Sequence, residues 1–441
     1  MFTAARYVIV DDDERELSML TSALQKMGAP CLPLHYDQAE GLDSSHLRGV
    51  RLLFLDLHLT TGAQTTNVSL AASIIVGMLE EGITATSGPY VIILWTKQAT
   101  QKDGFEAYVM EHLDPDKRPI AILGLDKNPY LAAGTGDQLL ADVARVVETD
   151  PRLKALFNWE REVLRAAGST LSEVASLVTE PDRRAPMFSE RLDEVLSLLA
   201  YEAVGSASAQ ADPFSAINAV LLPIMSDRIA NQRTNPDTDQ IWQAAVTRVA
   251  EVAAPDLATS ARLNTMLHVA VPTAEAMTAL SWGAVTIIPN DRVVALLTDR
   301  FDVDCRSLLA NVFGVQQRPH RRASRLALIR VGANCDYAQS RRGPIPFILG
   351  AVVPAVADRR RPSPKAEIAT PPIRLDGFDE PVAIVFNTHL QISMVPSDVA
   401  GWEPVCRIRE QLLMQVTTHG AVNATRPAIV RFAPAEDRVT L

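Results

Sequence analysis

Short, continuously apolar segments alternate with helical segments through the first 150 residues of the chain. Uninterrupted apolar runs are typical of strands that are buried on both faces of a parallel sheet. Between the first two runs, Leu17, Leu20 and Leu24 recur at the spacing of one helix face. The alternation predicts an α/β domain with a doubly wound, five-stranded parallel sheet. The expected strands are residues 7–10, 31–36, 51–57, 90–97 and 119–127, and the expected helices are residues 13–28, 69–82, 105–113 and 136–150.

Residues with reactive or metal-binding side chains stand at the ends of four of these strands. They are Asp11, Asp12 and Asp13 after the first strand, Asp56 in the third, Thr96 in the fourth and Lys127 in the fifth. In a doubly wound sheet the carboxyl ends of the strands meet at one edge, where ligands bind. The sequence therefore predicts a site at that edge with several carboxylates, a hydroxyl and an amine.

The aspartates alone leave a second interpretation open. An acidic run after a strand can simply cap the next helix and favour its dipole, and Asp12 or Asp13 could do this for residues 13–28. Asp56 fits that interpretation less well, because it lies between apolar residues and a buried carboxylate is costly without a partner.

The segments VIVDDD, LLFLDLHL, VIILWT and LDKNP follow one another in the order of the motifs of response-regulator receiver domains, and residues 5–150 resemble that family. The 44 residues from Asp12 to Asp56 are also a typical separation. The resemblance implies that Asp56 is a nucleophile that forms an aspartyl phosphate. It implies Mg²⁺ held by Asp11, Asp12, Asp56 and the backbone carbonyl of His58, with Thr96 and Lys127 binding the phosphoryl group.

The chain departs from the receiver pattern in the residues that usually report phosphorylation. Gly124 stands where an aromatic residue is usual, and Lys97 where a small residue is usual. Residues 60–67 and 97–104 are insertions, and Thr60 replaces a proline. We therefore expect a chemically complete phosphorylation site whose conformational response to phosphorylation is unusual. A pseudo-receiver, in which the pocket serves only as a binding module, is the alternative.

A phosphatase of the haloacid-dehalogenase type is a rival interpretation of the first strand. Asp11 and Asp13 have the D-x-D spacing of that family's first motif. However, Arg15 stands where Thr or Val would follow, and Asp56 would have no role.

The rest of the chain divides into a mostly helical region, residues 151–258, and a β-rich domain, residues 259–441, in which residues 403–420 are expected to form a closing helix. We find no compact helix–turn–helix with a basic second helix. The segment CDYAQ resembles a CDxxQ motif of β-rich domains of unknown function. Cys335 could be a nucleophile, or a metal ligand with Asp336 and His268 or His320, in an effector enzyme that the receiver gates; it could also be a buried structural cysteine.

A basic group in this domain consists of Arg321, Arg322, Arg325, Arg341 and Arg342. It could bind the acidic face of the receiver domain or an RNA, or form a solvated loop.

Charge and cysteine content suggest where the protein acts. Residues 1–150 hold 11 Lys and Arg against 21 Asp and Glu, and the rest of the chain is balanced, which makes nucleic acid a poor partner for the first domain. Four scattered cysteines without a CxxC pair, and no secretory leader, predict a cytoplasmic protein. The apolar residues 346–357 contain two prolines and are too short to span a membrane.

Together these features predict an atypical response regulator without conventional enzyme activity beyond phosphorylation and dephosphorylation of Asp56. Its expected partners are a histidine kinase or phosphotransfer protein and an effector protein, and a homodimer is left open. A large output without a DNA-binding motif resembles the response-receiver proteins of bacterial conflict and anti-phage signalling.

Overall fold

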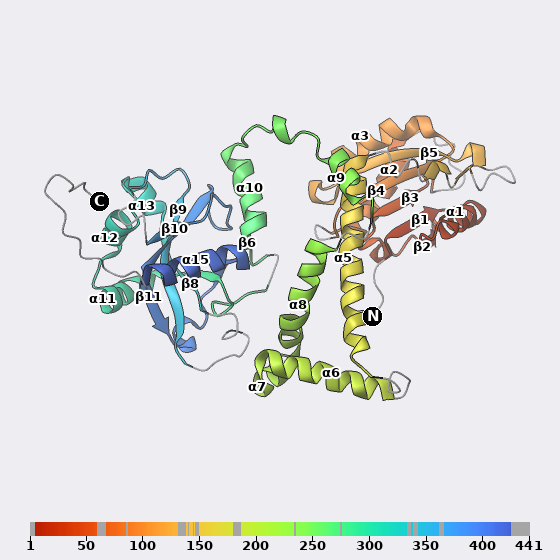
Figure 1. Ribbon diagram of the computed structural model, residues 1–441. Helices are drawn as coiled ribbons and strands as arrows, with labels where there is room; N and C mark the ends of the chain where they lie inside the picture. The colour runs from red at the N-terminus through yellow and green to blue at the C-terminus, as the bar shows by residue number, and fades with distance from the viewer. Residues whose placement is uncertain are drawn as a thin grey trace. The chain divides into compact units, whose positions relative to one another are not determined.

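The computed structural model describes residues 5–59, 68–84, 87–130, 138–139, 141–143, 145, 150–179, 187–232, 235–273, 276–332, 337, 343–360 and 366–424 (Figure 1). The chain divides into two compact units. The first unit comprises residues 1–162 and 233–247, and the second comprises residues 163–232 and 248–441.

The first unit is built on a five-stranded sheet in which every strand pair is parallel. Its strands are β1 (Tyr7–Asp11), β2 (Cys31–His35), β3 (Leu52–Leu55), β4 (Val91–Thr96) and β5 (Ala121–Asp126), in the order β2-β1-β3-β4-β5. Four of the strands fall within the segments predicted from their apolar runs, and β1 extends one residue past its predicted segment, to Asp11. The strand order is compatible with a receiver or flavodoxin-like fold.

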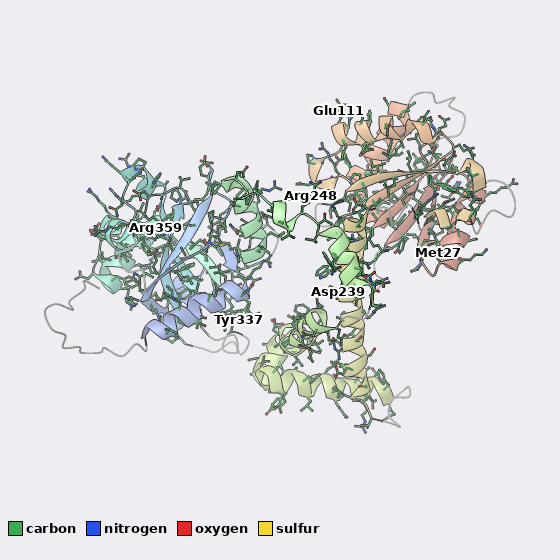
Figure 2. All side chains as sticks on the ribbon, turned by 45° about the horizontal axis from the view of Figure 1, so that its top comes forward. Met27, Glu111, Asp239, Arg248, Tyr337 and Arg359 are labelled. Carbon is green, nitrogen blue, oxygen red and sulfur yellow. The ribbon has the colours of Figure 1, made fainter. Side chains whose placement is uncertain are left out.

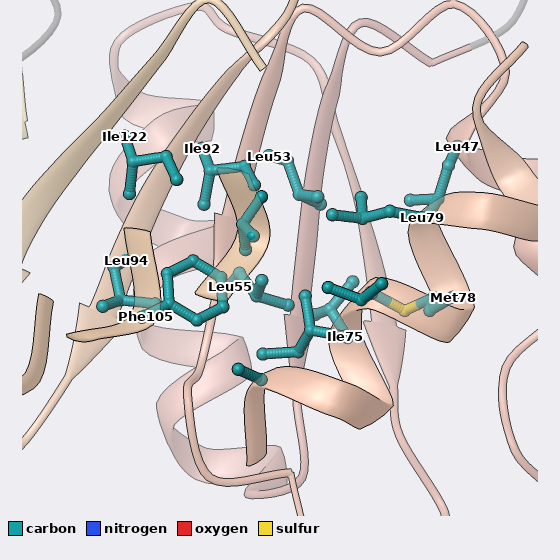
Figure 3. Packing of buried hydrophobic residues seen from close by; sticks show 14 of the residues in the cluster. Leu47, Leu53, Leu55, Ile75, Met78, Leu79, Ile92, Leu94, Phe105 and Ile122 are labelled. Carbon is teal, nitrogen blue, oxygen red and sulfur yellow. The ribbon is translucent and has the colours of Figure 1, made fainter. Parts of the chain in front are cut away.

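Side chains of the first sheet alternate between two hydrophobic cores. On one face, residues such as Leu53, Leu55 and Ile92 pack with α2 (Val68–Gly82) and α3 (Lys102–His112), as Figure 3 shows. The opposite face packs against α1 (Glu14–Lys26), the described residues between 138 and 145, and the start of α5 (Pro151–Ser176). Helices on both faces explain why the strands are apolar without interruption.

The start and the end of α1 have clear local causes. The Asp13 carboxylate accepts hydrogen bonds from the backbone N–H groups of Arg15 (2.8 Å) and Glu16 (3.3 Å), which makes Asp13 the N-cap. After the helix, Gly28 adopts a left-handed conformation with φ of 74°, which glycine reaches without strain. The chain can therefore turn directly into β2.

Residues 151–258 are mostly helical, as the sequence predicts. They contain α5, α6 (Met187–Val204), α7 (Ser206–Ala211), α8 (Pro213–Asn231), α9 (Thr238–Ala245) and the start of α10 (Leu257–His268). The first part of α5 is fixed to the first unit by the Glu160 carboxylate, which binds the Arg51 guanidinium at 3.0 Å. Among the described residues, no helix is long and apolar enough to cross a membrane.

The second unit contains a curled antiparallel sheet of seven strands in the order β10-β11-β9-β8-β7-β12-β6. The strands are β6 (Val269–Ala270), β7 (Ala284–Ile287), β8 (Arg325–Arg330), β9 (Ile345–Pro354), β10 (Glu367–Ala369), β11 (Val382–Met394) and β12 (Pro404–Ile408). Both faces are again covered. One packs against α15 (Glu410–Ala424), and the other packs against α11 (Asn290–Phe301) and residues 308–313 (Figure 1).

The prediction of a helix over residues 403–420 is wrong at its start. Pro404–Ile408 form β12, and α15 begins only at Glu410. Cys406 and Ile408 are fully buried on one side of the strand, so the local pattern has a period of two. Pairing with β7 and β6 overrides the helical periodicity that follows.

Candidate functional site

The carboxyl ends of four parallel strands bring the predicted site residues together. Asp11 ends β1, Asp56 follows β3, Thr96 ends β4, and Lys127 follows β5. Backbone hydrogen bonds between adjacent strand ends hold these residues next to one another. The Asp56 N–H donates to the Val10 carbonyl (3.0 Å), and the Lys127 N–H donates to the Thr96 carbonyl (3.1 Å). These four side chains are buried at one edge of the sheet.

Three carboxylates at this edge form a group that could hold a metal ion. One oxygen each from Asp11, Asp12 and Asp56 lies within 4.8 Å of the other two. Oxygen ligands of this kind suit hard cations, and Mg²⁺ typically takes one or two carboxylates and keeps several waters. The donors therefore fit Mg²⁺, although the same chemistry also suits Ca²⁺ or Mn²⁺.

His58 is the fourth predicted contributor to the metal site. Its ring Nε2 lies 3.0 Å from the Gln101 Oε1, so the imidazole is engaged with the turn before α3. A role for His58 in metal binding would fall to its backbone carbonyl, as the resemblance implies, and that role stays a prediction.

Lys127 compensates the negative charge of the group. Its Nζ lies 3.1 Å from Asp11, 2.9 Å from Asp56 and 2.6 Å from Glu16, and only 1% of the side chain is exposed. Burial alone would lower the pKa of Lys127, but Asp56, Asp11 and Glu16 together raise it above its usual range. The ammonium group therefore stays charged and joins three carboxylates.

Glu16 is a site residue that the sequence reasoning missed. It is buried on α1 and lies between two ammonium groups, with Lys127 and Lys97 each at 2.6 Å. Its spacing from Leu20 and Leu24 is four residues in each step, which places it on the inward stripe of the helix. That spacing was the signal that could have identified it.

Lys97, the residue that departs from the receiver pattern, is turned toward this cluster. Its Nζ pairs with Glu16, while its backbone carbonyl accepts a hydrogen bond from the Asn128 side chain (2.8 Å). Because Lys97 is about half exposed, it adds positive charge at the mouth of the site without being buried in it.

Gly124 leaves space where an aromatic residue is usual. It is exposed on β5, and of the residues that the structure describes, a Cβ there would meet only the Cδ of Lys102, at 3.5 Å. Thr96 is fully buried, and its Oγ1 accepts the Gln98 N–H at 3.2 Å. Gly124 has no side chain that could move in response to a change at Thr96.

The arrangement separates the two interpretations of the acidic run. Asp13 is exposed and caps α1, whereas Asp11 and Asp12 belong to the carboxylate group. A D-x-D phosphatase would need the side chains of Asp11 and Asp13 in one reaction centre, and here Asp13 is committed to the helix N-terminus. The geometry therefore gives that rival no support.

Asp11 is the group whose titration should control metal binding. Burial raises the pKa of Asp11 to about 6; Lys127 opposes this change and Asp56 adds to it. Burial, and then the charge of Asp56, also raise the pKa of Asp12. A carboxylate must be deprotonated to bind a cation, so Asp11 is available to a metal ion above about pH 6 and becomes protonated below it.

We expect Mg²⁺ to stabilise the first unit near neutral pH and above, and this effect to fade as the pH falls through about 6. Without metal, the stability contributed by Asp11 changes with pH in the opposite direction. Because the folded-state pKa of Asp11 is raised, its contribution to stability is present at low pH and is lost as the pH rises through about 6. Thermal unfolding with Mg²⁺ or with EDTA across this range measures both trends. Asp11→Asn should remove them, and a Mg²⁺ effect that does not change with pH would contradict the assignment.

Several candidates of the second unit lie outside the described residues. They are Cys335, Asp336, Gln339, Arg341 and Arg342. Of the two histidines considered as their partners, His268 ends α10 and His320 lies in α13 (Arg318–Ala323). The receiver-gated effector enzyme therefore stays a hypothesis from the sequence.

Comparison of the chain with protein-family models, with curated proteins and with solved structures gives no match.

Proposed function

We propose that this protein is an atypical response regulator that accepts a phosphoryl group on Asp56 with the help of Mg²⁺. The observation that carries the proposal is the carboxylate group at the sheet edge. Oxygens of Asp11, Asp12 and Asp56 lie within 4.8 Å of one another, and Lys127 Nζ lies 2.9 Å from Asp56. Thr96, at the end of the adjacent strand, supplies a buried hydroxyl.

Each residue has a role that its chemistry supports. An Asp56 oxygen attacks the phosphorus of the donor, and the bond from phosphorus to the leaving group breaks as the new P–O bond forms. Asp11 and Asp12 would hold Mg²⁺, which neutralises charge between the phosphoryl group and the carboxylates when it is bound. Lys127 pairs with Asp56 before the reaction and with a phosphoryl oxygen afterwards, and the Thr96 hydroxyl donates to another.

The proposed readout differs from the usual one. With Gly124 in place of an aromatic ring, a relay from Thr96 to a moving side chain is missing. Lys127 can report phosphorylation instead, because it must loosen its contact with Glu16 or Asp11 when it takes up a phosphoryl oxygen. In this proposal the protein acts in the cytoplasm, a histidine kinase or phosphotransfer protein supplies the phosphoryl group, and the output binds an effector rather than DNA.

The proposal predicts an Asp56-dependent adduct. Incubation with acetyl phosphate and Mg²⁺ should add the mass of one phosphoryl group, as measured on the intact protein. Asp56→Asn should abolish the adduct, and EDTA should prevent it. Asp13→Asn is the matched control, because asparagine caps a helix as well as aspartate and Asp13 lies outside the carboxylate group.

One observation favours the pseudo-receiver as a second candidate. Lys127 Nζ is closer to Glu16 (2.6 Å) than to Asp56 (2.9 Å), so Glu16 competes for the cation that the phosphoryl group needs. A protein that is stabilised by Mg²⁺ but forms no adduct, either with acetyl phosphate or with beryllofluoride, would be a metal-binding module and not a phosphoacceptor.

A further inference from the structure

An arginine-lined cavity lies in the second unit. Its volume is about 470 Å³, and it is lined by Cys305, Arg306 and Leu309 on one side and by Arg318, Arg321 and Arg322 of α13 on the other. A cavity of this size falls in the range of small-molecule sites. It lies outside the carboxylate group, which belongs to the first unit.

Among its described residues, the lining carries four guanidinium groups and no carboxylate. Within the described part of the chain, Arg306, Arg318 and Arg322 have no ion-pair partner. Asp304 lies outside the lining and caps a short helix, where its side chain accepts the Ser307 N–H at 2.9 Å, although its charge still reaches Cys305. One carboxylate against four guanidinium groups leaves the cavity with a net positive charge. Several positive charges that line one cavity raise the electrostatic potential inside it, and an anionic ligand would reduce their mutual repulsion.

The walls of the cavity are held in place by hydrogen bonds. Arg321 donates to the carbonyls of Val315 (2.9 Å) and Gln316, which ties α13 to the chain just before it. That chain is tied in turn to Arg359, labelled in Figure 2, whose Nε donates to the Phe313 carbonyl at 3.0 Å. Arg321 is therefore a positioning residue, and the other three guanidinium groups are available to a ligand on a preorganised frame.

The chemistry of the lining selects the ligand. The planar guanidinium group of arginine can donate two parallel hydrogen bonds to a pair of phosphate oxygens. Three available guanidinium groups therefore suit a ligand with at least two negative charges. Leu309 is buried, and with Cys305 it gives the cavity an apolar part that inorganic phosphate would not fill. We propose that this cavity binds a small organic phosphate of the nucleotide class, with the phosphates on Arg306, Arg318 and Arg322 and the apolar portion against Leu309.

Binding can be tested on the full chain, in EDTA so that the carboxylate group carries no metal. The probes are ATP, inorganic pyrophosphate and a short single-stranded RNA, and titration calorimetry gives the affinities. We expect ATP to bind and pyrophosphate to bind more weakly. Arg318→Ala and Arg322→Ala should each weaken ATP binding about tenfold or more, the size expected for a lost hydrogen bond to a charged group. Arg374→Ala is the control, because Arg374 is exposed and lies outside the lining.

Cys305 offers a second readout that does not depend on any arginine variant. ATP should slow the alkylation of Cys305, which mass spectrometry of the peptides measures, and should leave the alkylation of Cys31 in the first unit unaffected.

Arg322→Lys keeps the positive charge but loses the paired hydrogen bonds of the guanidinium group. This variant should fold normally and still bind ATP less tightly. The proposal is overturned if no probe binds or protects Cys305, if pyrophosphate binds as tightly as ATP, or if RNA binds more tightly than ATP through the same arginines.

Discussion

Lys127→Met is expected to lower the free energy of unfolding of the first unit by about 3–5 kcal/mol in EDTA, the usual effect of removing one partner from a buried ion pair. The reason is the position of Lys127 Nζ, which lies within 3.1 Å of three carboxylates and is 1% exposed. Methionine keeps the apolar stem but leaves Asp11, Glu16 and Asp56 without their shared cation. Urea unfolding measures the loss.

Two conditions should restore part of this stability. Mg²⁺ can replace some of the missing positive charge, and a fall in pH neutralises Asp11, whose pKa is raised further once Lys127 no longer opposes the effect of burial. Lys97→Met is the matched control: Lys97 binds the same Glu16 at the same 2.6 Å but is 48% exposed, so it should cost less than about 1 kcal/mol. Equal losses in the two variants would show that burial of the cluster matters less than we infer.

Gly350→Ala is expected to destabilise the second unit by about 3 kcal/mol, at the upper end of the usual cost of overpacking. Gly350 pairs with Phe386 across β9 and β11, and a Cβ there would lie 2.7 Å from the Val385 carbonyl oxygen and 2.9 Å from the Phe386 ring. One of these contacts is with backbone of the adjacent strand, so no side-chain rotation relieves it. The paired strands β9 and β11 would have to move apart.

Gly124→Ala is the control that separates steric overlap of the new Cβ from the general effect of replacing a glycine in a strand. Gly124 also lies in a strand, but within the described part of the chain a Cβ there meets only the flexible Lys102 side chain, at 3.5 Å. This variant should be neutral or gain up to about 1 kcal/mol, because alanine restricts the unfolded chain. Calorimetric unfolding of both variants gives the comparison, and a Gly350→Ala protein as stable as the parent would contradict the packing around β9.

The first sheet and the residues at its edge could be predicted from the sequence because both depend on short-range patterns. Apolar runs mark strands buried on two faces, and parallel strands necessarily bring Asp56 and Lys127 to the same edge. Glu16 was missed because its role depends on packing between α1 and the strand ends. As an isolated charge it looks like part of the acidic first turn.

The second unit was harder to predict because its elements are defined by distant partners. Pro404–Ile408 become a strand only through pairing with β7 and β6, which lie more than a hundred residues earlier in the chain. The helices α11 and α13 lie within a region read as β-rich, where they cover one face of the sheet or line the arginine cavity. No local pattern in the sequence predicts that cavity.

The order of strands in the second sheet also bears on self-association. Its outermost strands are β10 and β6, which are only three and two residues long. The long strand β9 lies between β11 and β8 and pairs with both, and β10 pairs with Val385, Phe386 and Asn387 of β11. Among the described strands, each outermost strand therefore offers a strand from another molecule only a short template, which disfavours edge-to-edge growth through β10 or β6.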